Sequence, residues 1–284
     1  MIRFSFVGRY LLWFLLFLLL GVLMRLFVFE LCFIPTNSME DSIMVGDRVM
    51  VGKLCYGGLR PRCIADIPLV NVLIFFKSIR ETDRERDWGY RRAPALGKVR
   101  RGDLVVFNHP NESNVRMVKR CVALPGDTIK LEKGQVLING SMVNFPTTVK
   151  IPESSGTGHI IDFPCRSLGW TENDFGPAVI PAQGMTLALD SANLELYRNM
   201  IRLEDHEIIS FDTEIYIDGV AVSDYTFKTD GFFVLGDNRI HSIDSRYFGV
   251  VPEQLIIGKA KFVYFSADTE KKQIRWKRIG NFLK

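Results

Sequence analysis

An apolar segment near the amino terminus constrains this chain more than any other feature. The fifteen residues from Tyr10 to Met24 carry no charge and are mostly Leu, Phe, Val or Trp. As a helix they would span roughly 22 Å, less than a hydrocarbon core of about 30 Å. Continuing to Phe29 gives twenty residues, with the head of Arg25 reaching the interface by snorkelling. Because the segment has no polar side, a buried helix of a water-soluble protein is disfavoured. We predict a transmembrane anchor over residues 10–29.

The charges around this segment set its orientation. Arg3 and Arg9 precede it, and no acidic residue occurs before Glu30. Basic flanks stay in the cytoplasm, so residues 1–9 form a short cytoplasmic terminus and the rest of the chain is exported. A cleaved signal peptide is the rival interpretation, but residues 25–34 offer no small residues for a cleavage site. We expect a single-pass protein of the inner (cytoplasmic) membrane, with its main domain on the outer, periplasmic side.

Composition excludes several other classes. The net charge of +4 is small, which argues against a nucleic-acid partner. The cysteine count is odd and no C-x-x-C pair occurs, so neither a zinc site nor a redox motif is indicated, and we predict no metal and no cofactor. Two alternatives stay open for Cys55 and Cys63, a disulfide that closes a short loop or unpaired thiols. The cysteines are Cys32, Cys55, Cys63, Cys121 and Cys165.

The exported part has the pattern of antiparallel β structure. Short β-type runs alternate with turn signals such as Asn139-Gly140 and Asp218-Gly219. We predict a mainly β fold, with a transmembrane helix followed by an antiparallel β core and a smaller inserted β domain. The ranges expected are 30–143 and 228–284 for the core and 144–227 for the insert. The expected strands are Arg48–Lys53, Asp103–Phe107, Arg116–Ala123, Gln135–Ile138, Glu214–Ile217, Phe232–Leu235 and Ala260–Tyr264.

Two further stretches have an open interpretation. Ile67–Phe76 is apolar but too short to span a bilayer, so it is either a strand lying against the membrane surface or a core strand. The stretch that follows, Lys77–Arg101, has dense alternating charge; we expect a solvated loop and assign it no chemistry.

A short polar motif, Pro35-Thr36-Asn37-Ser38-Met39, directly follows the apolar segment. A serine hydroxyl is a poor nucleophile unless a base removes its proton, and acyl transfer also needs donors for an oxyanion. The Thr36 hydroxyl and the Ser38 backbone N–H are candidate donors, and Pro35 would stiffen the approach to the turn. Taken alone, such a motif is usually an ordinary turn.

Lys119 lies in a largely apolar β-type run. Burial lowers the pKa of a lysine because the charged form loses hydration, and a neutral lysine can act as a general base. Side chains alternate along a strand, so Lys119 and Arg120 should face opposite ways, one entering a site while the other stays in water. The alternative is a surface Lys-Arg pair on an edge strand.

Polar residues crowd the segment Gly236–Gly249, just after an apolar run. This density suits a hydrogen-bonded loop that supports a site. Ser242 is a candidate partner for the lysine amine, and Asp244 and Arg246 are candidates for a bracing pair. An Asx-rich turn is the alternative.

The serine motif, the run with Lys119 and the polar segment Gly236–Gly249 follow the anchor in this order. Together they resemble the bacterial type I signal peptidases, which are serine proteases of the Ser-Lys class. The resemblance implies a mostly β catalytic core with an inserted β domain. It also implies a serine endopeptidase that removes signal peptides from exported preproteins through an acyl-enzyme, without a cofactor. Five stretches carry it: Pro35–Met39, Arg101–Phe107, Lys119–Asp127, Gly236–Gly249 and Ile274–Gly280.

Carried over residue by residue, the resemblance makes Ser38 the nucleophile and Lys119 the general base. The Thr36 hydroxyl and the Ser38 N–H form the oxyanion hole, and Ser242 orients the lysine amine. Asp244, Arg246 and Asp237 support the loop, while Ile34, Met117 and Val118 line shallow apolar pockets for small residues before the cut. The implied partners are preprotein signal peptides, bound as an added strand, and membrane lipid, with the export translocon nearby.

The chain departs from the family pattern at several positions. Asp41-Ser42 replaces the usual proline-threonine after the nucleophile motif, so the local backbone should differ. Ile240 and His241 stand where the family often has Asp and Asn, and we expect His241 to be a loop residue. The stretch Ile64–Lys98 is longer than the resemblance leads us to expect.

Three other functions compete with the signal peptidase interpretation. A self-cleaving Ser-Lys repressor or mutagenesis protein is soluble, so the anchor counts against it. An anchored scaffold without catalysis would use Ser38 and Lys119 only as structural residues. A general periplasmic protease would accept peptides without an upstream apolar segment.

Overall fold

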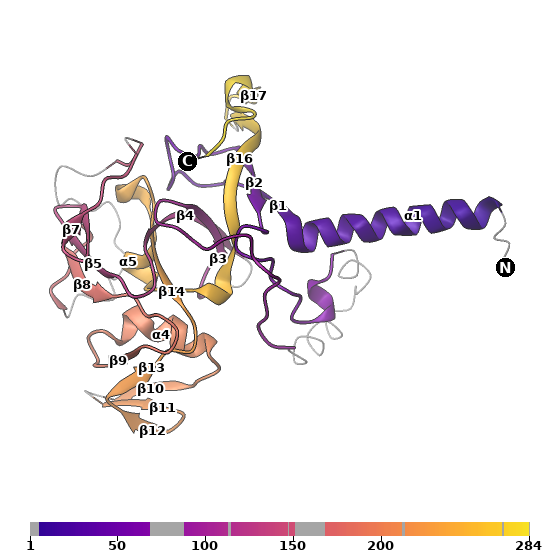
Figure 1. Ribbon diagram of the computed structural model, residues 1–284. Coiled ribbons are helices and arrows are strands. Elements are labelled where there is room, and N and C mark those ends of the chain that lie inside the picture. The colour runs from indigo at the N-terminus through magenta and orange to yellow at the C-terminus, as the bar shows by residue number, and fades with distance from the viewer. Residues whose placement is uncertain are drawn as a thin grey trace.

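The computed structural model describes residues 6–68, 88–112, 115–146, 148–150, 168–211, 214–268 and 270–283. Figure 1 shows helix α1 (Phe6–Leu23) projecting away from a β-rich domain. A π-helical turn, Met24–Val28, continues it, and strand β1 (Phe29–Phe33) begins at the next residue. The helical span that is apolar enough to cross a membrane covers Gly8–Val28. It overlaps the predicted anchor except at Phe29, which already belongs to the strand.

A large antiparallel sheet forms the centre of the domain. Neighbouring strands follow the order β1-β2-β16-β3-β4-β14-β15, and β17 pairs with β16. Long β16 (Ile256–Asp268) bends at register shifts while it pairs with both β2 and β3. The other strands are β2 (Asp47–Gly52), β3 (Leu104–Asn108), β4 (Arg116–Ala123), β14 (Gly231–Leu235), β15 (Val251–Pro252) and β17 (Gln273–Ile274).

Between β4 and β14 the chain leaves this sheet and builds smaller ones. A four-stranded sheet has the order β7-β6-β5-β8, a three-stranded sheet the order β10-β11-β12, and β9 pairs with β13. Their bounds are β5 (Thr128–Glu132), β6 (Gln135–Ile138), β7 (Ser141–Met142), β8 (Phe175–Val179), β9 (Thr186–Ala188), β10 (Ile208–Phe211), β11 (Glu214–Ile217), β12 (Val220–Val222) and β13 (Asp224–Thr226). The mainly antiparallel β fold is confirmed. The predicted boundary at residue 144 falls within the four-stranded sheet, and the division into domains stays a prediction.

The short helices lie beside these strands. The amphipathic helix α4 (Leu194–Leu203) was not predicted from the sequence, which led us to expect a β-rich insert. Its buried residues include Leu196, Met200 and Ile201, spaced for one helical face. The other helices in the described ranges are η2 (Ile64–Asp66), η4 (Arg239–His241), α5 (Ser245–Phe248), η5 (Glu253–Leu255) and η6 (Trp276–Arg278).

Two predicted hairpin turns are confirmed by their backbone angles. Asn139 and Gly140 have φ of 51° and 78°, and Asp218 and Gly219 have the same pair of values. Positive φ at both central residues matches the right-handed twist of the strands, which is why Asn-Gly and Asp-Gly favour such turns. They join β6 to β7 and β11 to β12.

Part of the long charged stretch is ordered against the preceding segment. The Ala93 N–H donates to the Gly58 carbonyl at 2.9 Å, and the Leu96 N–H donates to the Leu54 carbonyl at 2.9 Å. The apolar run Ile67–Phe76 lies largely outside the described residues, so both interpretations of it stand as predictions.

Candidate active site

The nucleophile motif forms a turn directly after β1. The Ile34 N–H donates to the Asp47 carbonyl at 3.0 Å, so the chain leaves the sheet at a fixed point. Ser38 is only 8% exposed, and its Oγ lies 3.4 Å from the Thr36 Oγ1. The Ile43 N–H donates to the Met39 carbonyl at 2.7 Å and closes the turn beyond the serine. The two hydroxyls of the motif therefore point into the same space.

The loop after β14 holds this turn from the other side. The Asn238 backbone N–H donates to the Ser38 carbonyl at 3.0 Å, and its Nδ2 donates to the Asn37 carbonyl at 3.2 Å. Gly236 fits where no side chain would. A Cβ there would lie 2.7 Å from the Ser38 carbonyl oxygen and 2.1 Å from the Ser242 Oγ. The close approach of this loop to the serine turn requires glycine.

Lys119 lies within β4, where it pairs with Val105 of β3. It is 2% exposed, and among the described residues its amine has no hydrogen bond and no ion pair. Burial lowers the pKa of Lys119 to about 8, with a smaller push downward from Arg246, while Asp244 and Asp237 raise it. A lysine of this kind is partly neutral near physiological pH.

The sheet register relates Lys119 to Gly236, the glycine that lies against the Ser38 turn. Leu235 of β14 pairs with Arg120 of β4, so Gly236, the next residue, comes beside Lys119. Gly236 also approaches the Ser38 carbonyl closely. The nucleophile candidate and the base candidate therefore share one neighbour, although they lie 81 positions apart in the sequence.

Asp244 and Arg246 form a fully buried pair behind this loop. The Arg246 Nε donates to Asp244 Oδ1 at 2.8 Å, and its Nη2 donates to Oδ2 at 2.9 Å. Oδ2 also accepts the Gly236 N–H at 3.0 Å, which ties the pair to the glycine. Burial alone would raise the pKa of Asp244, but the charge and hydrogen bonds of Arg246 hold that pKa below its ordinary value. The expected ion pair is present.

Asp237 pairs with Arg120, and one expectation is wrong here. Arg120 is 1% exposed instead of lying in water. Its guanidinium donates to both Asp237 oxygens and to the Gly102 carbonyl, and Ser42 also donates to Asp237. Lys119 and Arg120 are both buried, and the loop after β14 supplies the carboxylate that pairs with Arg120. The signal in the sequence was a second charge directly beside Lys119 in a largely apolar run.

The predicted pocket residues separate into two groups. Ile34 and Val118 pack with the same buried cluster, which also contains Met39. Met117 packs with a different cluster that contains Phe107. Neighbouring residues of a strand point to opposite faces, so Met117 and Val118 do not line one pocket surface together.

Ser242 is fully buried beside Gly236, but its Oγ has no hydrogen-bond partner in the described part of the chain. The expected bond to the Lys119 amine is therefore not formed in this structure. His241 is exposed at the end of η4, as expected for a loop residue.

A family model described as signal peptidase, peptidase S26, matches residues 7–265. The chain belongs to this family. A signal peptidase I of Buchnera aphidicola subsp. Baizongia pistaciae is 28% identical, in an alignment that covers 93% of this chain and 80% of the relative. One of Haemophilus influenzae is 28% identical, covering 87% of this chain and 66% of the relative. One of Rickettsia akari is 29% identical, covering 87% and 75%.

A solved structure titled as a signal peptidase I from Enterococcus faecalis also matches, with 20% identity and a TM-score of 0.27. It covers 58% of this chain and 98% of that chain.

Among the described residues, no group of three His, Cys, Asp or Glu side chains is arranged to hold a metal ion. Cys55 is a free thiol, so the alternative of a Cys55–Cys63 disulfide is wrong in this structure. Cys165 lies outside the described residues.

The departure at Asp41 has a structural consequence. Its φ is 74°, in the left-handed region, whereas a proline ring fixes φ near −65°. The turn after the nucleophile therefore adopts a backbone that the proline usual in the signal peptidase family could not adopt.

Proposed function

We propose that this chain is a membrane-anchored signal peptidase in which Ser38 is the nucleophile and Lys119 the general base. The observation that carries the proposal is a buried lysine amine without an ion-pair partner on strand β4, next to the residue that pairs with Leu235. Leu235 precedes Gly236, the glycine that contacts the serine turn. A buried cation without a counter-ion is costly, and an inert structural residue gains nothing from it.

The proposed cycle follows from these positions. Neutral Lys119 removes the Ser38 proton, and Ser38 Oγ attacks the scissile carbonyl carbon. The lysinium then protonates the leaving amine, which releases the mature protein. Lys119, neutral again, activates a water molecule that hydrolyses the ester and frees the signal peptide.

The oxyanion would be held by the Thr36 hydroxyl and the Ser38 backbone N–H. The Thr36 Oγ1 is already close to the Ser38 Oγ, and the Ser38 N–H donates to no described residue. Both donors are thus available where the negative charge develops. In this scheme the Ser242 hydroxyl, which has no hydrogen-bond partner among the described residues, orients the lysine amine.

The supporting and substrate-contacting roles are part of the same proposal. Asp237, Asp244 and Arg246 hold the loop that contacts Ser38. Ile34 and Val118 line the apolar surface for small side chains of the preprotein, whereas Met117 points to the opposite face of β4 and packs in a different cluster.

The location follows from the anchor. The amino terminus lies in the cytoplasm and the catalytic domain on the outer face of the membrane, where membrane lipid and the export translocon are its neighbours. Substrates are preproteins with an apolar segment before the cut.

The deciding experiment incubates the detergent-solubilised full chain with a purified preprotein and locates the cut by mass spectrometry. The proposal predicts one cut after the signal peptide, absent with Ser38→Ala and with Lys119→Ala. Equal cleavage of a peptide lacking the upstream apolar segment would favour a general protease.

A further inference from the structure

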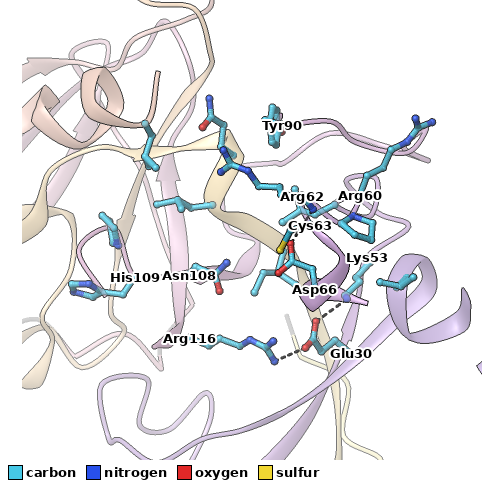
Figure 2. A pocket seen from close by; sticks show the side chains of 18 of the residues that line it. Glu30, Lys53, Arg60, Arg62, Cys63, Asp66, Tyr90, Asn108, His109 and Arg116 are labelled. Atoms are coloured by element: carbon cyan, nitrogen blue, oxygen red, sulfur yellow. Dashed lines mark hydrogen bonds and ion pairs between the residues drawn. The ribbon is translucent and has the colours of Figure 1, made fainter. Parts of the chain in front are cut away.

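A cavity of about 720 Å³ lies where the membrane helix meets the β domain, separate from the Ser38 turn. Leu26, in the last turn of the helical span, forms part of its wall. Figure 2 shows its polar lining, with Glu30 between Lys53 and Arg116. The charged side chains among its described lining residues are basic Lys53, Arg60, Arg62, Arg116 and Arg202, and acidic Glu30 and Asp66.

The acidic side chains of the lining are already engaged. The Glu30 carboxylate pairs with Lys53 at 2.8 Å and with Arg116. Lys53 also donates to the Arg25 carbonyl at 2.8 Å, which fixes the ammonium at the helix end. Asp66 accepts the Arg62 backbone N–H at 2.9 Å. Among the described lining residues, five cationic groups face two anionic ones, so this part of the lining carries an excess of positive charge.

These cations converge from distant parts of the chain. Arg202 comes from α4, and its Nη2 donates to the Pro110 carbonyl at 3.2 Å and to the Asn111 Oδ1 at 3.3 Å. Arg116 opens β4, whereas Arg60 lies in the segment after β2. Like charges in one concave site repel one another and destabilise the fold. Solubility alone therefore does not explain why they cluster here.

Two polar groups of the lining also have hydrogen-bonding capacity that the described residues do not use. The buried side-chain oxygen of Gln254 has no hydrogen-bond partner among the described residues. Burial lowers the pKa of His109, another lining residue, so its ring is neutral and keeps a nitrogen available for hydrogen bonding.

We propose that this cavity binds the phosphate of an anionic phospholipid headgroup at the outer membrane–water interface. Guanidinium groups match phosphate oxygens in geometry and charge. Leu26 belongs to the span that can cross a membrane, so an occupant of the cavity lies at the level of lipid headgroups. An acidic polypeptide would satisfy the charges but gives no reason for a wall made by the membrane helix. The proposal rests on the membrane attachment and is independent of the Ser38–Lys119 chemistry.

Native mass spectrometry of the full chain in detergent tests this site. Dioleoyl phosphatidylglycerol and dioleoyl phosphatidylcholine are titrated separately, and bound lipid is counted. We expect the anionic lipid to bind at least tenfold more tightly. Arg60→Gln/Arg116→Gln should abolish that preference, whereas Lys130→Gln/Lys271→Gln, an equal charge change at exposed positions outside the cavity, should retain it.

Each remaining outcome decides against the proposal. Equal binding of the two lipids, or an equal loss in both double variants, would overturn it. Displacement of the lipid by an equal concentration of inorganic phosphate would indicate a free-anion site, and displacement by a glutamate-rich peptide would indicate a polypeptide site. Should the double variant not fold, Arg60→Gln alone, at an exposed position, must weaken binding at least threefold. Ser38→Ala must bind the lipid like the unaltered chain even if no peptidase activity exists.

Discussion

Arg120 and Asp237 form a buried ion pair through two hydrogen bonds, Nε to Oδ1 at 2.7 Å and Nη2 to Oδ2 at 2.6 Å. Arg120 follows the proposed base in β4, and Asp237 precedes the residue whose N–H holds the Ser38 carbonyl. The pair therefore fastens the strand of Lys119 to the loop that positions Ser38.

Removing one partner of the Arg120–Asp237 pair should lower the free energy of unfolding substantially. Asp237→Ala leaves the Arg120 guanidinium buried without its carboxylate, and we expect a loss of about 3–5 kcal/mol in the free energy of unfolding. Urea denaturation measures it. Glu132→Ala breaks the exposed Lys130–Glu132 pair and is the matched control, with little expected change. An equally small effect of both substitutions would contradict the structural role of Asp237.

Gly236→Ala should impair catalysis more than folding. The new methyl group would meet the Ser242 Oγ and the Ser38 carbonyl, and moving the latter displaces the nucleophile turn. We expect kcat/KM for preprotein cleavage to fall by about 100-fold, since shifts on the order of 1 Å in a catalytic geometry cost that much.

The double variant Gly236→Ala/Ser242→Gly separates the two contacts. It relieves the clash with Ser242 but leaves the contact with the Ser38 carbonyl, so its activity should stay below that of Ser242→Gly alone. Full activity in Gly236→Ala would show that the loop does not position the serine.

Asp41 tests the altered turn after the nucleophile. Glycine adopts its left-handed φ without strain, whereas proline cannot adopt it at all. We expect Asp41→Gly to retain most activity and Asp41→Pro to lose more than tenfold, although proline is the residue usual in the family. Thermal unfolding run in parallel separates a local turn defect from global loss of structure. Higher activity in Asp41→Pro than in Asp41→Gly would contradict the observed turn.

The features of the fold that could be predicted from the sequence are those with local signals. Asn139-Gly140 and Asp218-Gly219 specify their turns because few other dipeptides adopt positive φ twice. Helix α4 was not predicted, because a helix of only ten residues between turn-rich segments gives a weak signal of hydrophobic periodicity. The sheet order, in which β16 near the carboxyl end separates β2 from β3, depends on packing between distant segments.

The candidate site was predictable in its residue types but not in its contacts. Ser38 and Lys119 stand out through their motifs, and Asp244 and Arg246 are near enough in sequence to suggest a pair. Burial of Arg120 was missed because its carboxylate comes from 117 positions away. No local pattern indicates such a partner.

The pH dependence of cleavage follows from the pKa of Lys119. The neutral amine is the active form, and a pKa of about 8 leaves roughly one amine in a hundred neutral at pH 6. We expect kcat/KM to rise about tenfold per pH unit from pH 5 to 7 and to level off above about 8. A profile that is flat over this range would contradict the assignment of Lys119 as base.

The lowered pKa of Lys119 should also appear in the pH dependence of the free energy of unfolding, which does not depend on catalysis. The pKa of Lys119 is lower in the folded chain than its ordinary 10.5, so between pH 8 and 10.5 the unfolded state binds the additional proton. The free energy of unfolding then rises with pH through this window. Lys119→Met should remove that rise, and urea midpoints at several pH values measure it.

Covalent trapping of the serine tests the central claim most directly. The full chain is incubated with a penem that acylates serine hydrolases, and the modified peptide is identified by mass spectrometry. We predict one adduct, on Ser38, that is lost in Ser38→Ala and forms at least 1,000-fold more slowly in Lys119→Ala, because an unassisted hydroxyl is a poor nucleophile. Acylation at another serine, or an unchanged rate in Lys119→Ala, would contradict the account.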